Sequence, residues 1–212
     1  MSIILNPAPP WQPDRSEYVN LWHGCTVLDK NAIQANGIDL TVCTVAADFG
    51  RGFYTTTLER QSRQWAWDRF YKWRLRHPTG TGNQPVILRF RARRYTVPSV
   101  KGPLDEGLDR LVSLAFVVGD YHYEDYWSLV QHCRQSTKAA INDHRHPMGG
   151  WYDLVSGPVA AFWEQRVAMD DGDQLSFHTD QGVRLLNALI QEGLKSGVNG
   201  NPDYYRWYPV TP

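Results

Sequence analysis

The sequence predicts an α+β fold, and three observations support that prediction. Short stretches rich in β-branched and aromatic residues occur early and late in the 212-residue chain. Segments with apolar residues at helical spacing lie between them. The elements do not alternate in the β-α-β rhythm of a parallel sheet. We therefore expect one domain over residues 1–212, with a mostly antiparallel β-sheet and flanking helices.

The first part of the chain predicts a lead-in, a strand and a helix. Residues 1–17 are rich in proline, and we expect them to follow the surface. The run Tyr-Val-Asn-Leu-Trp at 18–22 predicts a short strand. Thr26 is a candidate N-cap for a helix that ends at Gly37. Residues 38–47 predict no regular structure.

A glycine-rich run, DFGRGFYTTT at 48–57, predicts a tight loop that enters a strand near Tyr54. A strong helix is expected over 58–76, followed by a turn cluster over 77–85. Alternating apolar residues predict a strand over 86–92. The stripe of the helix that we expect to face the core consists of Leu58, Ser62, Ala66, Phe70 and Trp73.

The second half of the chain predicts two further helices, over 104–118 and 123–134, and a loop over 139–150. The remaining expected elements are short strands over 152–159, 166–169 and 174–179, a helix from its cap Asp180 to Leu194, and an edge strand over 204–210.

The composition limits which partners and which cellular compartment we expect. Twenty-two basic and 22 acidic side chains give a net charge of zero, so no global field favours nucleic acid or a membrane surface. Three irregularly spaced cysteines favour a reducing compartment. The start of the chain has no basic region before an apolar run, and no segment is long enough to span a bilayer. We expect a cytoplasmic protein, or a secreted effector that reaches a cytosol without an N-terminal signal peptide.

Four motifs occur in order along most of the chain: LWHGC at 21–25, DFGRGFYTTTLERQSRQWA at 48–66, YDLVSGPVA at 152–160 and DQLSFHT at 173–179. Together they resemble the H-Y-[EQ] branch of the ADP-ribosyltransferase superfamily. The resemblance is to a bacterial domain family with LYHGS, DFGxGFYxTTxxxQAxxWA, YDxVxGPVA and DQxxFHT. The departures are Trp22 for Tyr, Cys25 for Ser and Ser62 for Ala, none of which removes a group that the chemistry needs.

The resemblance implies an ADP-ribosyltransferase-like split sheet with NAD bound in the cleft between its halves. It implies a mono-ADP-ribosyltransferase, a toxin or effector that releases nicotinamide from NAD and modifies a macromolecular acceptor, protein or nucleic acid. An antitoxin or immunity protein would be a further partner. The implied catalytic residues are His23, Tyr54 and Gln174. The implied NAD-binding residues are His23, Gly24, Cys25, Phe49, Gly50, Arg51, Gly52, Phe53, Tyr54 and Gln174.

Each implied role suits the residue type. The ring of His23 has a donor and an acceptor for ribose hydroxyls, and the backbone of Gly24 can approach the nicotinamide amide. Tyr54 offers a flat face to the nicotinamide ring. Gln174 would hydrogen-bond the nicotinamide ribose, although it is neutral where many relatives have Glu. Glu164, Asp171 and Asp173 lie nearby in sequence and could supply the missing charge, although the adjacent Asp173 would point to the opposite face of a strand.

One face of the helix over 58–76 is a candidate target-binding surface, because arginine and aromatic residues are enriched where partners bind. It comprises Arg60, Arg63, Trp67, Tyr71 and Arg74. The alternative is a solvated face whose Trp67 and Tyr71 are covered by the helices expected between 104 and 134.

Other functions stay open at this point. The same fold could act as an NAD glycohydrolase, or as a non-catalytic module that binds NAD or nucleic acid. A zinc site would use His122, His144 and His146, but no second ligand pair has zinc-like spacing, and we expect no metal. A hydrolase would pair Cys25 with His178, without a supporting nucleophile motif.

Overall fold

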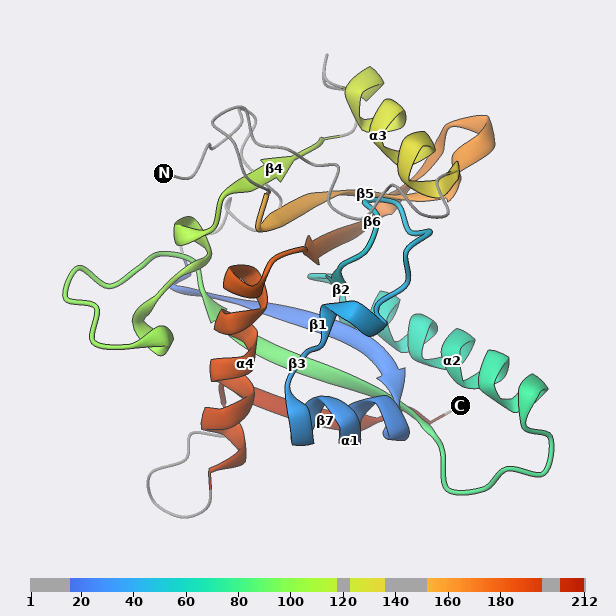
Figure 1. Ribbon diagram of the computed structural model, residues 1–212, viewed down its shortest axis with the longest axis horizontal. Helices are drawn as coiled ribbons and strands as arrows, with labels where there is room; N and C mark the ends of the chain where they lie inside the picture. Colours follow the sequence, from blue (N-terminus) through green and yellow to red (C-terminus); the bar gives the residue numbers. More distant parts are fainter. Residues whose placement is uncertain (1–15, 118–122, 136–151, 196–202, 212) are drawn as a thin grey trace.

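The computed structural model describes residues 16–117, 123–135, 152–195 and 203–211, and its fold is α+β, as predicted. Two sheets form the centre (Figure 1): sheet A has the strand order β1-β3-β7, and sheet B has the order β2-β6-β5-β4. All neighbouring strands are antiparallel except β4 and β5. The strands are β1 (Tyr18–Thr26), β2 (Phe53–Thr55), β3 (Pro85–Arg93), β4 (Ser113–Ala115), β5 (Leu154–Phe162), β6 (Val167–Phe177) and β7 (Tyr205–Pro209).

Four helices of the described chain lie around the sheets, together with short 3-10 turns. Figure 1 shows α3 beside sheet B, and α1, α2 and α4 around sheet A. The helices are α1 (Val27–Asn36), α2 (Glu59–Arg76), α3 (Tyr123–Gln135) and α4 (Asp180–Leu194), and the 3-10 turns are η1 (Leu40–Val42), η2 (Pro103–Asp105), η3 (Leu108–Arg110) and η4 (Trp163–Gln165).

Local sequence signals set both ends of α1. The Thr26 hydroxyl accepts a hydrogen bond from the backbone N–H of Asp29, and the Asp29 carboxylate accepts one from the N–H of Thr26. This reciprocal capping box satisfies amide groups that the first turn cannot pair. Gly37 ends the helix with φ of 80°, a region that favours glycine. The predicted limits of this helix are therefore confirmed.

Helix α2 packs closely on one face of sheet A. Ala66 and Ser62 of the predicted inward stripe are fully buried there, whereas its other members, Leu58, Phe70 and Trp73, are only half-buried. A Cβ on Gly24 of β1 would lie 2.1 Å from the Ser62 carbonyl oxygen. Only glycine permits this approach of the helix backbone to the strand. The position of α2 therefore depends on Gly24.

Helix α4 packs against the apolar core that sheet A shares with sheet B. Val183, Leu186, Leu189 and Ile190 are buried against apolar residues of β1, β3 and β6. The cap differs from the prediction, because the Thr179 hydroxyl, not Asp180, accepts from the N–H of Gly182 at 3.1 Å. The backbone at Thr179 is still extended, so Asp180 becomes the first helical residue.

The helix expected over 104–118 does not form. The segment instead makes the turns η2 and η3 and then β4, which pairs with β5. Gly107 lies so close to the backbone of Tyr95 that a Cβ would meet it at 2.4 Å. The Asp109 carboxylate accepts hydrogen bonds from the N–H and hydroxyl of Thr96, at 2.8 and 2.7 Å. These long-range contacts override the helical spacing of the apolar residues.

Two further strand predictions change. Instead of two short strands over 166–169 and 174–179, β6 is continuous, because Gln61 of α2 bonds both backbone groups of Asp173. Those two hydrogen bonds keep the polar middle of β6 extended. The tail forms the edge strand β7, as predicted. The expected loop over 139–150 and most of the lead-in over 1–17 lie outside the described residues.

Replacing Gly24 by Ala should destabilise the fold by about 1–3 kcal/mol, because the added methyl group forces α2 away from β1. Urea unfolding measures the loss. Gly102→Ala is the matched control, since nothing lies within 4 Å of the position of its Cβ. Equal stability of the two variants would contradict this account of the helix–sheet contact.

Candidate functional site

Among the described residues, one isolated backbone bridge joins the two sheets, between β1 and the residue that follows β2. Trp22 and Thr56 exchange two backbone hydrogen bonds, of 2.8 and 2.9 Å. In an antiparallel ladder the next such pair would join Gly24 to Tyr54. The Tyr54 carbonyl instead accepts a hydrogen bond from Nδ1 of His23, at 2.6 Å. The imidazole thus takes the place of backbone pairing where the sheets separate.

This contact fixes the chemical state of His23. A carbonyl oxygen only accepts, so Nδ1 carries the proton and Nε2 of the neutral ring keeps its lone pair. The ring is buried and lies on the ring of Phe53, with 4.3 Å between centroids. Burial, helped by the positive charge of Arg69, lowers the pKa of His23 from 6.5 to about 4. At neutral pH, Nε2 can therefore accept a hydrogen bond from a hydroxyl group.

A pocket of about 420 Å³ lies beside His23. Residues 52–54, part of α1 and the segment around η1 line it together with the histidine. Arg69 of α2 contributes a cation, while Asp29 and Asp39 contribute carboxylates. Pockets of this size, with apolar walls and a few polar groups, are typical of small-molecule sites.

Tyr54 does more than offer a flat ring. Its hydroxyl donates to the Gly50 carbonyl at 2.8 Å and accepts from the N–H of Phe49 at 2.9 Å. These bonds close the loop over the phenol, and Gly50 supplies a φ of 77° for the turn. Burial raises the pKa of Tyr54, so the side chain stays a neutral phenol. The tyrosine therefore organises the loop as well as lining the pocket.

The expected NAD-binding residues separate into two groups. Among the described residues, those that line the pocket are His23, Gly52, Phe53 and Tyr54. Gly24 faces α2, Cys25 lies in the core, and Phe49 packs against Phe116 and Tyr126 beside sheet B. Expected residues outside the pocket lining are Gly24, Cys25, Phe49, Gly50, Arg51 and Gln174.

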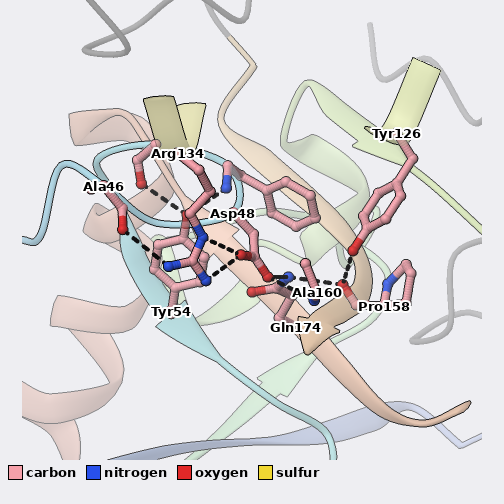
Figure 2. Close-up of polar contacts among 10 residues, drawn as sticks. Ala46, Asp48, Tyr54, Tyr126, Arg134, Pro158, Ala160 and Gln174 are labelled. Atoms are coloured by element: carbon pink, nitrogen blue, oxygen red, sulfur yellow. Dashed lines mark hydrogen bonds and ion pairs between the residues drawn. The ribbon is translucent and has the colours of Figure 1, made fainter. Parts of the chain in front are cut away.

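Gln174 is held in a buried polar network on the α3 side of sheet B (Figure 2). Its amide nitrogen donates to the Asp48 carboxylate at 2.6 Å and to the Pro158 carbonyl at 2.8 Å. Both amide hydrogens are thereby used, and the side chain is only 3% exposed. Only the amide oxygen is left to accept a further hydrogen bond.

Asp48 is a functional candidate that the sequence analysis missed. Its carboxylate also accepts from the N–H of Ala160 at 2.9 Å and pairs with the guanidinium of Arg134, with 2.5 Å between the closest atoms. Asp48 is 3% exposed, so these partners compensate its charge within the protein. The available signal was a carboxylate between apolar residues at the start of the DFG motif.

The acids expected to assist Gln174 point elsewhere. Asp173 binds the hydroxyl groups of Thr56 and Thr57. Asp171 pairs with Arg60 at the surface, at 2.7 Å, and Glu164 is exposed. The carboxylate that contacts Gln174 is therefore that of Asp48, 126 residues away along the chain.

The candidate target-binding face of α2 is exposed in part. Arg60 pairs with Asp171, and Arg63 pairs with Glu59 one turn before it, both at 2.7 Å. Trp67 packs against a small cluster that contains Ala66 and Ile87. Tyr71 is 64% exposed, so the alternative in which it is covered by elements between 104 and 134 does not occur.

The rival sites gain no support. Cys25 is buried in the core, and burial raises the pKa of its thiol, which opposes thiolate chemistry. His178 bonds the Arg51 carbonyl through Nδ1 at 2.8 Å. The proposed zinc ligands His122, His144 and His146 lie outside the described residues. Within the described part of the chain, no group of three candidate ligands gathers, and no helix is long and apolar enough to cross a membrane.

Comparison with known proteins adds no family. No family model, curated protein or solved structure matches this chain. The site must therefore be interpreted from its own geometry and from the motifs.

We expect the stability of the protein to fall between about pH 6.5 and pH 4 partly through His23. Its pKa is lower in the folded than in the unfolded chain, so the unfolded state binds the proton first as pH falls. The loss amounts to at most about 3 kcal/mol. Urea unfolding across this pH range measures how the free energy of unfolding changes with pH. This change should be smaller for His23→Gln than for the wild type, whatever the difference in stability between the two proteins. Identical slopes would contradict the assignment of a buried, neutral histidine.

Gln174→Glu should destabilise the protein at neutral pH by about 1–3 kcal/mol, because it places a second carboxylate against Asp48 in a buried site. The loss should shrink as pH falls, since a protonated carboxyl can again donate to Asp48. Thermal unfolding at pH 7 and pH 5 measures both effects. The exposed Gln165→Glu is the control and should show neither.

Proposed function

We propose that this protein is an NAD-dependent mono-ADP-ribosyltransferase that binds NAD in the pocket beside His23. The observation that supports this most is the convergence of two distant motifs at one place. His23 from the first motif bonds the backbone of Tyr54 from the second, and both line the pocket. The bond occurs where the sheet splits, which is where the resemblance places NAD.

The chemistry of each group follows from its fixed state. Transfer of ADP-ribose breaks the bond between nicotinamide and ribose, and positive charge develops on the ribose. Nε2 of His23 accepts a hydrogen bond from a ribose hydroxyl, which holds the sugar. The ring of Tyr54, held by its own loop, stacks on nicotinamide.

Gln174 acts in this proposal as an acceptor. It lies two residues before Ser176, the β6 partner of Tyr54, so Gln174 and Tyr54 project from the same face of sheet B. Because Asp48 and Pro158 take both amide hydrogens, Oε1 is the atom left to accept from the nicotinamide ribose. Asp48 thereby orients the amide, and its own carboxylate lies next to the amide nitrogen. Gln174 lies outside the pocket lining, so this contact requires the ribose to reach past Tyr54 toward β6.

The acceptor and the biological role belong to the same proposal. We propose that the face of α2 with Arg60, Arg63, Trp67, Tyr71 and Arg74 meets a macromolecular acceptor or an inhibitory antitoxin. The resemblance supports a bacterial toxin or effector. Arg60 and Arg63 already have acidic partners, so the exposed Tyr71 and the end of the helix carry more of this contact.

The direct test is to incubate the protein and a cell lysate with NAD labelled on its adenylate part, and to measure nicotinamide release and the label on protein or nucleic acid. Release with transfer of label supports the proposal. Release with free ADP-ribose alone would identify a glycohydrolase, and no NAD binding or release would reject both.

Tyr54→Ala should weaken NAD binding by about 1–3 kcal/mol, since it removes the stacking face and loosens the loop. Calorimetric titration with NAD measures the change. Tyr95→Ala, which removes an exposed tyrosine outside the pocket, should bind NAD like the wild type. Unchanged affinity in a folded Tyr54→Ala variant would show that the site lies elsewhere.

A further inference from the structure

The basic residues of this neutral chain are unevenly distributed. No Asp or Glu occurs between Asp68 and Asp105, although the chain has 22 of them. The same interval contains nine of the 22 Lys and Arg residues. They are Arg69, Lys72, Arg74, Arg76, Arg89, Arg91, Arg93, Arg94 and Lys101.

Four of these cations gather on the last two turns of α2. Figure 1 shows this half of the helix extending away from the sheets toward the loop that leads to β3. No residue between 68 and 79 is buried. We call this part the basic helix end, and it comprises Arg69, Tyr71, Lys72, Arg74, Leu75 and Arg76.

The charges of the basic helix end are not neutralised within the described part of the chain. None of its four cations forms an ion pair there, unlike Arg60 and Arg63 on the first turns of the same helix. Arg74 donates to the Gly80 carbonyl at 2.6 Å, and Arg76 donates to the Lys72 carbonyl at 3.2 Å. These bonds to neutral groups orient the guanidinium groups and leave their charge uncompensated.

One aromatic and one aliphatic side chain are exposed among the cations. Tyr71 is 64% exposed and Leu75 is 63% exposed. Trp73 lies between the rings of Phe70 and His77, with interplanar angles of 17° and 18°.

We propose that the basic helix end binds single-stranded nucleic acid, and that the acceptor of the proposed transferase is nucleic acid. The second part rests on the proposed function, whereas the first stands alone. Four cations within about 11 Å of helix match a ligand that repeats negative charge along its length. Tyr71 can stack on a base only where the base is unpaired.

A protein partner fits this surface less well. Stable protein interfaces bury a sizeable patch, with a largely apolar centre from which charged residues are depleted. The basic helix end offers only two exposed apolar side chains among four charges. A polyanion needs no such centre, because counterion release drives its binding.

The test measures binding of fluorescein-labelled 20-mers of oligouridylate and oligothymidylate by fluorescence anisotropy at several salt concentrations, without NAD. The wild type should bind, with affinity falling as salt rises. The variant Lys72→Gln/Arg74→Gln/Arg76→Gln should bind at least about tenfold more weakly, and its log–log salt slope should be smaller by about 2. Arg69 is left unchanged because it also lines the pocket.

Two further variants distinguish specific binding at the basic helix end from general electrostatic attraction. Arg166→Gln/Arg184→Gln/Arg206→Gln removes three exposed cations elsewhere, each of which pairs with an acid, and should bind like the wild type. Tyr71→Ala should bind about 5- to 100-fold more weakly with an unchanged salt slope. Equal weakening in both triple variants, or none in either, would overturn the proposal.

The two proposals fail in distinguishable ways. The Lys72/Arg74/Arg76 variant should release nicotinamide from NAD at the wild-type rate while labelling of nucleic acid falls. A wild type that binds the oligonucleotides but not NAD would reject the transferase and keep the nucleic-acid surface. A wild type that binds neither oligonucleotide would reject the surface, and label found only on protein would reject a nucleic-acid acceptor.

Discussion

The hydrogen bond between His23 Nδ1 and the Tyr54 carbonyl, at 2.6 Å, is the contact on which the site depends. It lies directly after the backbone pair of Trp22 and Thr56, where the ladder between β1 and β2 stops. A side chain replaces a backbone donor there, so the sheets remain joined without continuing to pair. The same bond sets the tautomer of His23, and burial keeps its ring neutral.

The loop after Ala47 is held from several sides, which supports a preformed pocket. The Tyr54 hydroxyl closes the loop onto Phe49 and Gly50, and His178 bonds the carbonyl of Arg51. Asp48 fastens the start of the loop through Arg134. A site whose groups are fixed before a ligand arrives loses less entropy on binding.

The sequence predicts those parts of the fold whose signals are local. The cap at Thr26, the turn at Gly37 and the inward residues Ser62 and Ala66 of α2 occur as expected. The helix expected over 104–118 fails because Gly107 and Asp109 are held by a distant segment. Apolar spacing cannot anticipate contacts of that kind.

The candidate site shows the same difference between what the sequence predicts and what depends on long-range contacts. The resemblance of the motifs implied one site for His23 and Tyr54, and both line the same pocket. The partner of Gln174 could not be found that way, since Asp48 lies 126 residues earlier and its role depends on how β6 passes the loop. The available signal in the sequence was the position of Asp48 between the apolar residues Ala47 and Phe49.

The central claim is that NAD occupies the pocket where His23 holds the two sheets together. The most direct measurement is nuclear magnetic resonance of ¹⁵N-labelled protein during titration with NAD, including the ring nitrogens of His23. The account predicts large shifts for His23 Nε2, for residues 52–54 and for α1, while Nδ1 keeps its proton. Saturating NAD without shifts in these groups, or with shifts confined to another surface, would contradict it.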